Sequence, residues 1–185
     1  MKKNIAIIMG GYSSEIEISL KSGNVVYQNI SKDIYNTYKV HILKNKWFLA
    51  DDHGNKYPIN KHDFSAEVNG EKINFDCVFN AIHGHPGEDG TILAYFDLIG
   101  LKHTSAPFYQ MALAFNKRDT LSVVKEYGIP IAKSFYLHQR DEIDTGRIIK
   151  KVGLPCFVKP NRAGSSFGIS KVYKEENLKV AIEKA

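Results

Sequence analysis

The stretch that decides the fold is NIAIIMGGYSSE, residues 4–15. An apolar run is ended there by Gly10 and Gly11, which is typical of a strand buried on both faces of a parallel sheet. Ser14 followed by Glu17 matches a capping box, so a helix is predicted immediately after the glycines. A strand, a glycine turn and a helix in this order indicate a βα unit, from which open α/β sheets are built.

The same order recurs further along the chain. Residues 76–82 form a second apolar run, residues 83–90 are a polar loop with three glycines and a proline, and residues 91–98 are predicted to be helical. In open α/β sheets, ligands bind at the carboxyl ends of the strands. We therefore expect the loops at Gly10 and His83 to meet in one crevice.

The residues between these two units are expected to extend the sheet. Residues 38–43 alternate in polarity and predict a strand. Asn69-Gly70 lies between two short strand-like segments and predicts a type I′ hairpin. Residues 46–75 are therefore expected to form an antiparallel decoration of the sheet.

The pattern of the sequence changes near residue 105, and we place a domain boundary there. Beyond it, Asn116 is a candidate cap for a helix over residues 117–127. Residues 133–137, 154–159 and 169–173 are expected to be strands, and residues 141–151 and 175–185 are expected to be helices. The last helix ends without a Gly or Pro stop signal, so we expect the chain to be part of a longer protein.

The charge is divided unequally along the chain. The net charge of +5 comes from 25 Lys and Arg against 20 Asp and Glu. Residues 1–100 carry 10 basic and 12 acidic residues, a net charge of −2, whereas residues 101–185 carry 15 basic and 8 acidic residues, a net charge of +7. A basic half of this size fits a nucleic acid, a membrane or a phosphorylated small molecule.

Several classes of protein are excluded. No apolar run approaches the roughly 20 residues that cross a bilayer, and the run before Gly10 is too short for a signal peptide. The only two cysteines, Cys77 and Cys156, are expected to be buried free thiols of a reducing compartment. No Cys/His spacing matches a zinc site. A soluble cytoplasmic protein with no metal ligand set in this chain is therefore expected.

The loop KPNRAGSSFG, residues 159–168, is the first candidate site. A strand delivers Lys159 to its end, and the Gly/Ser segment that follows offers backbone N–H groups in a concave array that suits phosphate oxygens. The loop is not a P-loop, because its Lys precedes the glycines. The alternative is a β-hairpin whose Gly and Ser merely make the turn.

Three other residues are candidates, each with an ordinary structural alternative. Glu15 lies in a first helical turn, as a cap or as the partner of a ligand ammonium group. His83 follows a buried strand, as a hydrogen-bonded loop residue or as a group that orients or deprotonates an amine. Lys117 opens a helix, where a cation opposes the dipole, so an anion or solvent is expected beside it. Glu88-Asp89 is expected to be a cap rather than a metal pair.

Together these motifs resemble one family. The order is Gly10-Gly11-x-Ser13-x-Glu15-x-Glu17-x-Ser19, then His83-Gly84-x-x-Gly87-Glu88-Asp89-Gly90, then Lys117, then Val158-Lys159-Pro160 and Gly164-Ser165-Ser166-x-Gly168. It resembles the D-alanine–D-alanine ligase family of the ATP-grasp superfamily over residues 4–174.

The resemblance implies a fold and a reaction. The implied fold is a Rossmann-like preATP-grasp domain over residues 1–105, followed by the first α+β lobe of an ATP-grasp domain over residues 106–185, without the C-terminal lobe. The implied reaction is ATP-dependent ligation of two D-alanines through an acyl phosphate, for peptidoglycan synthesis in a bacterium. The alternatives are a ligase that makes D-alanyl-D-lactate or D-alanyl-D-serine and, in another class, a non-enzymatic nucleic-acid-binding module.

The resemblance also implies roles for the candidate residues. Glu15 would hold the ammonium of the first D-alanine, Gly10 and Gly11 would favour negative charge at the reacting carbon, and His83 would face the second D-alanine. Ser165 would link to Glu15 in a hydrogen-bond network. The ATP phosphates would be bound by Lys117, Lys159, Gly164, Ser165 and Ser166.

Two departures and one absence accompany the resemblance. Ala163 stands where the family usually has an acid, and Asn116 stands where it commonly has Asp, although Asn also caps a helix. No Glu/Asn pair suited to Mg²⁺ occurs near the end of the chain, so the ligands of Mg²⁺ are expected beyond residue 185. We therefore expect a homodimeric enzyme of which this chain alone is an inactive portion.

Overall fold

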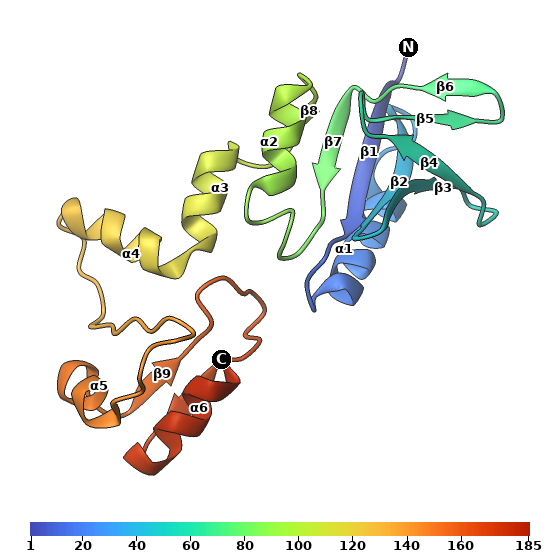
Figure 1. Ribbon diagram of the computed structural model, residues 1–185. Coiled ribbons are helices and arrows are strands. Elements are labelled where there is room, and N and C mark those ends of the chain that lie inside the picture. The colour runs from blue at the N-terminus through green and yellow to red at the C-terminus, as the bar shows by residue number, and fades with distance from the viewer. The chain divides into compact units, whose positions relative to one another are not determined.

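The computed structural model describes residues 1–185 and contains two compact units, Met1–Ala112 and Leu113–Ala185 (Figure 1). The first unit, unit 1, is built around one eight-stranded sheet with the strand order β6-β5-β4-β3-β2-β1-β7-β8. Its strands are β1 (Lys3–Gly10), β2 (Tyr35–Leu43), β3 (Lys46–Ala50), β4 (Lys56–Asn60), β5 (Ser65–Val68), β6 (Glu71–Ile73), β7 (Cys77–Asn80) and β8 (Lys102–His103).

The centre of this sheet is parallel and is covered on both faces. β1 pairs in parallel with β2 on one side and with β7 on the other, and β7 pairs in parallel with β8. Ile5, Ile7 and Met9 of β1 pack with residues of α1 (Ile16–Asn29), whereas Ala6 and Ile8 lie in the cluster that includes α2 (Thr91–Leu98). Successive strand residues point to opposite faces, which explains why the whole run is apolar.

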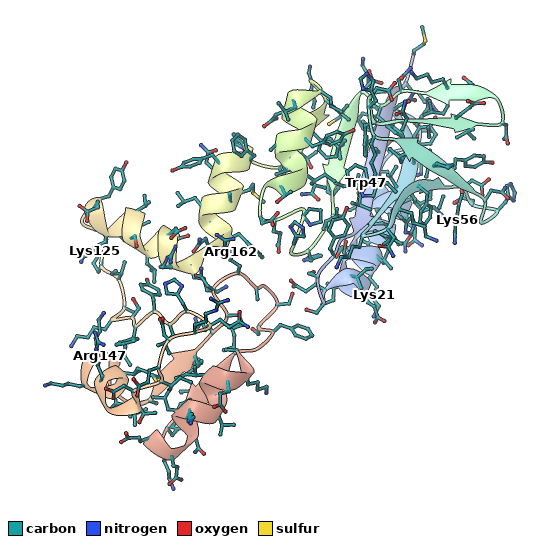
Figure 2. The ribbon with its side chains drawn as sticks, in the orientation of Figure 1. Lys21, Trp47, Lys56, Lys125, Arg147 and Arg162 are labelled. Atoms are coloured by element: carbon teal, nitrogen blue, oxygen red, sulfur yellow. The ribbon has the colours of Figure 1, made fainter.

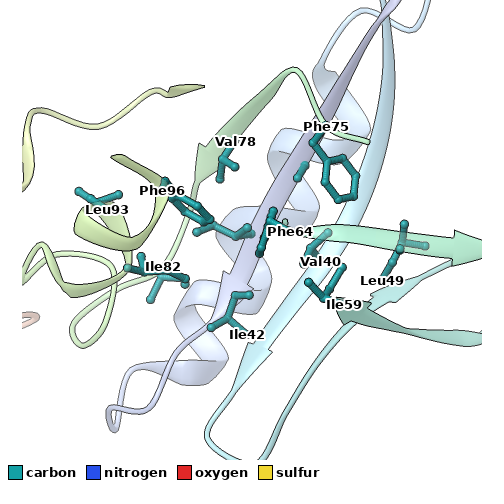
Figure 3. Close-up of a cluster of buried hydrophobic side chains, with 14 residues drawn as sticks. Val40, Ile42, Leu49, Ile59, Phe64, Phe75, Val78, Ile82, Leu93 and Phe96 are labelled. Atoms are coloured by element: carbon teal, nitrogen blue, oxygen red, sulfur yellow. The ribbon is translucent and has the colours of Figure 1, made fainter. Parts of the chain in front are cut away.

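The larger hydrophobic cluster fills the α2 face of the sheet. Figure 3 shows Phe64, Phe96, Val40 and Ile42 converging there, and the rings of Phe64 and Phe96 meet edge to face with centroids 4.9 Å apart. All four side chains are fully buried. Burying a side chain of this kind stabilises a fold by about 1.5–3 kcal/mol, so this cluster is the main support of unit 1.

The antiparallel part of the sheet lies on the far side of β2. Strands β3 to β6 each pair antiparallel with the strand before them, as predicted for residues 46–75. Asn69 and Gly70 both have positive φ, at 53° and 82°, as a type I′ turn requires, so the predicted hairpin is confirmed.

The second unit, unit 2, is smaller and mostly helical. α3 (Phe108–Phe115) spans the boundary between the units, and the remaining helices and strands of the chain are α4 (Lys117–Glu126), α5 (Thr145–Val152), β9 (Cys156–Val158), β10 (Ser170–Val172), the 3₁₀ helix η1 (Glu175–Asn177) and α6 (Leu178–Lys184). β9 and β10 form a two-stranded antiparallel sheet. The hydrophobic core of unit 2 holds only four buried residues, Ile148, Val172, Leu178 and Ala181.

Three local predictions were wrong. Residues 133–137 form no strand; Phe135 and Leu137 instead pack against the core of unit 2 without joining a ladder. The predicted capping box does not form, because Glu15 occupies the N-cap position of α1 without a side-chain cap. Cys77 and Cys156 are free but only half-buried.

Candidate active site

The substrate side of the site lies where β1 and β7 end. We call Gly10, Gly11, Glu15 and His83 the substrate set. The chain leaves β1 toward β2 on one side, whereas β7 lies on the other side, so the two strand ends flank a topological switch point. Such points are where open α/β sheets bind ligands. The structure therefore brings all four residues of the substrate set to one edge of one sheet.

A buried serine fixes the turn after β1. Gly10 and Gly11 have φ of 106° and 95°, a left-handed region that favours glycine. The Gly10 amide donates to Ser19 Oγ over 2.8 Å, and that hydroxyl donates to the carbonyl of Ala81 over 2.8 Å. Ser19 is 0% exposed. One hydroxyl of α1 thus joins the end of β1 to the segment that follows β7.

Glu15 presents a buried carboxylate with one oxygen lacking a partner. The residue is 3% exposed, and its Oε1 has no hydrogen-bond partner. Burying a carboxylate without a partner is unfavourable, so the arrangement fits a cationic ligand group that would complete it. A Cβ added at Gly84 would lie 3.1 Å from Glu15 Oε2, which shows how closely the loop after β7 approaches this carboxylate.

His83 is held by hydrogen bonds from two elements. Its carbonyl accepts a hydrogen bond from Ser13 Oγ at 3.0 Å, and its Nε2 lies 3.0 Å from Ser22 Oγ of α1. In the same loop, the Gly84 amide donates to Glu88 Oε2 over 2.7 Å. The imidazole is therefore oriented by a helix rather than exposed on a loose loop.

A hollow of about 350 Å³ opens beside this turn, and its walls come from the Gly11 turn, the start of α1 and the β2–β3 connection, namely Gly11, Tyr12, Ser13, Ile16, Leu43, Lys44, Asn45 and Lys46. The hydroxyl of Tyr12 accepts a hydrogen bond from Nε1 of Trp47 over 2.7 Å; Trp47 is marked in Figure 2. This bond ties the turn to the antiparallel part of the sheet.

A second, separate group of candidate residues lies in unit 2. We call Lys117, Lys159, Gly164, Ser165 and Ser166 the phosphate set. Lys159 follows β9 and is exposed, with its ammonium 5.5 Å from the ring centroid of Phe157. Ser165 and Ser166 are exposed and have positive φ, at 45° and 60°. Two turns stabilise the loop, with the Phe167 amide donating to Gly164 and the Ile169 amide to Ser166.

Lys117 lies against the same loop. It is the first residue of α4, and Asn116 caps this helix as predicted, accepting from the Asp119 amide at 3.2 Å. Its ammonium donates to the carbonyl of Ala163 over 2.6 Å and to that of Asn161 over 3.5 Å. Loop carbonyls therefore lie beside this cation, and the anion or solvent expected there stays a prediction. The link from Ser165 to Glu15 would join different units and stays a prediction.

The residues that support these sets were not predicted from the sequence. Ser13, Ser19 and Ser22 fix the substrate set, and Asn161 contacts the start of α4. Ser19 and Ser22 are three residues apart and therefore lie on one face of α1. That spacing of two serines, where an apolar stripe would be expected, is the signal that could have revealed them.

The titratable groups of the chain give no metal site. No group of three or more His, Cys, Asp or Glu side chains in residues 1–185 could hold a metal ion. The two His and two acids of the loop at His83 are used within it, since Glu88 accepts from Gly84 and His85 Nδ1 lies 2.5 Å from Asp89. No helix is both long and apolar enough to span a membrane.

A mixed α/β unit with a buried carboxylate at its switch point, followed in the chain by a unit with a Lys-bearing Gly/Ser loop, has the fold class that the resemblance to ATP-grasp ligases predicts. The comparisons with known proteins give the family. The family model described as "D-ala D-ala ligase N-terminus" matches residues 4–106, and that described as "D-ala D-ala ligase C-terminus" matches residues 123–185. The chain belongs to the D-alanine–D-alanine ligase family.

Relatives agree with this assignment. D-alanine–D-alanine ligase of Flavobacterium johnsoniae is 65% identical over 99% of this chain, and that of Christiangramia forsetii is 56% identical over 96%. The chain spans 57% and 55% of the length of these two proteins.

Solved structures share the fold. D-alanyl-alanine synthetase A of Vibrio cholerae matches 100% of this chain and 56% of its own, with a TM-score of 0.84 and 29% identity. The VanG D-Ala:D-Ser ligase of Enterococcus faecalis matches 100% of this chain and 60% of its own, with a TM-score of 0.80 and 30% identity. D-alanine–D-alanine ligase of Bacillus anthracis, solved in complex with ATP, matches 98% and 54%, with a TM-score of 0.70 and 25% identity.

Proposed function

We propose that the protein to which these 185 residues belong joins two D-alanines in an ATP-dependent reaction for peptidoglycan synthesis in the bacterial cytoplasm. Residues 1–105 are the substrate-binding domain, and residues 106–185 are the first part of the ATP-grasp domain. The observation that carries the proposal is the buried Glu15 carboxylate at the switch point, with one oxygen that lacks a partner.

The substrate set suits an amino acid. The Glu15 carboxylate binds the ammonium of the first D-alanine through charge-assisted hydrogen bonds. α1 begins at Ile16, with four residues between it and the Gly10-Gly11 turn, and its positive end favours the negative charge that develops at the reacting carboxyl group. His83, oriented through Ser22, faces the second D-alanine and orients its amine or accepts its proton.

The phosphate set suits the nucleotide. Lys117 and Lys159 are point charges for phosphate oxygens, while Gly164, Ser165 and Ser166 cover those oxygens with amides and hydroxyls. ATP supplies the phosphoryl group that activates the first carboxylate as an acyl phosphate. No group of three or more His, Cys, Asp or Glu side chains in residues 1–185 could hold a metal ion, so this chain's proposed contribution to nucleotide binding is the two lysines and the loop.

The second substrate distinguishes this reaction from those of ligases that make D-alanyl-D-lactate or D-alanyl-D-serine. A D-Ala:D-Ser ligase is among the structural matches, at 30% identity, whereas the relatives at 65% and 56% identity are D-alanine–D-alanine ligases. The higher identity favours D-alanine. Product analysis on the whole protein, with D-serine and D-lactate competing against D-alanine, separates the three reactions.

We propose a homodimer for the whole protein.

The decisive experiment is D-alanine binding to the 185-residue chain, measured by calorimetry or NMR titration. Glu15→Gln removes the charge but keeps the shape, and we expect binding to weaken about thirtyfold, because a hydrogen bond between charged groups contributes roughly 1.5–3 kcal/mol. Glu17→Gln, two residues on and exposed, is the matched control and should bind as the parent does.

The stability of the same variants separates binding from folding. Glu15→Gln should leave the chain folded and raise its melting temperature, because burying an amide is less unfavourable than burying an unpaired carboxylate. Equal D-alanine affinity of Glu15→Gln and the parent would contradict the proposed role of Glu15.

A further inference from the structure

The start of α4 is capped by a residue from a distant part of unit 2. The first amides of a helix have no partner within it. The Lys117 amide donates to the Asn161 carbonyl over 3.3 Å, and the Arg118 amide donates to Asn161 Oδ1 over 2.9 Å. The Asp119 amide is satisfied by Asn116, the ordinary N-cap. Two of these three donors are therefore satisfied by one residue 43–44 positions away.

The side chain of Asn161 is used at both ends. While Oδ1 accepts from Arg118, Nδ2 donates to Asn116 Oδ1 over 2.8 Å. Asn116 is 4% exposed, and its Oδ1 also accepts from Asp119, so this oxygen serves two donors. An aspartate at position 161 would lack the donor and an alanine would lack both groups. The contact therefore requires a primary amide.

This cap also fixes the phosphate set. Asn161 lies two residues after Lys159 and begins the loop that continues to Gly164 and Ser166. The Lys117 ammonium donates to the carbonyls of Asn161 and Ala163, so the side chain and the loop are joined at two points. Asn161 thus holds the loop at its beginning, and Lys117 holds it again at Ala163.

The cap also changes where an anion can bind. A helix N-terminus attracts phosphate through its unpaired amides and its dipole. In α4 these amides are already occupied by Asn161 and Asn116. An incoming phosphate therefore meets the Lys117 ammonium and the loop rather than the helix end.

We propose that Asn161 is a positioning residue that fixes Lys117 and the Gly/Ser loop in one arrangement before the nucleotide phosphates bind. It acts through these groups and does not itself touch the phosphates. The inference rests on the proposed function, which assigns Lys117 and the loop to ATP.

The experiment compares the whole protein with its Asn161→Ala variant and with its Asn177→Ala variant as the matched control. Asn177 is an exposed asparagine of the same unit, at the start of α6, with no side-chain cap hydrogen bond. Two readouts are taken, backbone amide exchange without ligand and ATP affinity in the presence of Mg²⁺. In Asn161→Ala we expect the Arg118 amide and the loop amides to exchange roughly tenfold faster and ATP to bind about tenfold more weakly. Asn177→Ala should match the parent in both.

Asn116→Ala tests the same contact from the other side. Asn116 and Asn161 share one hydrogen bond, so the double variant should lose less ATP affinity than the two single losses combined. This variant pair also keeps the test decisive if Asn161→Ala alone proves poorly folded by circular dichroism.

Each outcome decides a different point. If the amides of Arg118 and of the loop exchange at the parent's rate in Asn161→Ala, then Asn161 does not hold the loop against the start of α4, and the proposal is wrong. Faster exchange with ATP affinity equal to that of Asn177→Ala would overturn the positioning role and leave the proposed function intact. Absence of ATP binding in the unsubstituted whole protein would overturn the assignment of unit 2 to ATP and the nucleotide part of this proposal together, while the exchange data still decide whether Asn161 holds the loop.

Discussion

The substrate set and the phosphate set are built in opposite ways. In the substrate set, Gly10, Gly11 and Glu15 are buried at the edge of an eight-stranded sheet, and His83 is half-buried. In the phosphate set, Lys159, Ser165 and Ser166 are exposed beside a sheet of two strands. The same contrast holds for the two cores, since unit 2 has only four buried residues in its hydrophobic cluster.

This difference fits the two kinds of ligand proposed for the two sets. A small amino acid offers few contacts, so its selection depends on a closely packed and preformed pocket. A polyphosphate is large and charged, and flexible cations and amides can adapt to it. We therefore expect substitutions in the substrate set to change folding stability and binding together, and those in the phosphate set to change binding alone.

The largest effect is expected from Gly84→Ala. Gly84 has φ of 72°, and an added Cβ would lie 2.6 Å from Ser13 Oγ. Strain and crowding together should lower the free energy of unfolding of unit 1 by about 3 kcal/mol, as measured from amide exchange in β1. Gly70→Ala is the control, because its φ is 82° but an added Cβ meets nothing within 4 Å. Its cost should be only about 1 kcal/mol; similar values for both variants would show that the pocket is not closely packed.

A smaller effect is expected from Ser19→Ala. The change leaves the Gly10 amide and the Ala81 carbonyl without a partner in a buried place. The free energy of unfolding of unit 1 should fall by about 2 kcal/mol, and D-alanine affinity should fall with it. Ser14→Ala, at an exposed position close by, should change neither. If Ser19→Ala melts at the parent's temperature, the turn is held by something other than this hydroxyl.

The smallest effect is expected from Ser166→Gly in the phosphate loop. At φ of 60° a glycine relieves about 1 kcal/mol of backbone strain, but it also adds a comparable entropy to the unfolded chain. The net change in stability should stay below about 0.5 kcal/mol in amide exchange of unit 2. ATP affinity should fall because the hydroxyl is lost. A stability change as large as that of Ser19→Ala would remove the contrast between the two sets.

Patterns of near neighbours in the sequence predicted much of this molecule. The buried strand before Gly10, the hairpin at Asn69-Gly70 and the cap at Asn116 are all confirmed. Each depends on a few adjacent residues whose chemistry permits few alternatives. The residues of the two candidate sets came from motifs of the same kind together with a family resemblance.

Predictions failed where distant contacts decide the local structure. Ser14 does not cap α1, because Glu15 occupies the N-cap position. The side-chain hydrogen bonds of this turn come from Ser13, whose hydroxyl donates to the His83 carbonyl 70 positions away and accepts from the Glu15 amide. The link between Asn116 and Asn161 spans 45 positions and has no local pattern. Residues 133–137 have the composition of a strand but no partner strand, so packing alone determines their conformation.

The hairpin turn at Asn69-Gly70 has a practical consequence. In the strand order, β4, β3 and β2 separate the β5–β6 hairpin from β1, whose end carries the substrate set. Asn69 and Gly70 are exposed, and the space beside Gly70 is open. A fluorescent label or a short affinity tag inserted at this turn would therefore give experimenters a handle on unit 1 that leaves the substrate set untouched.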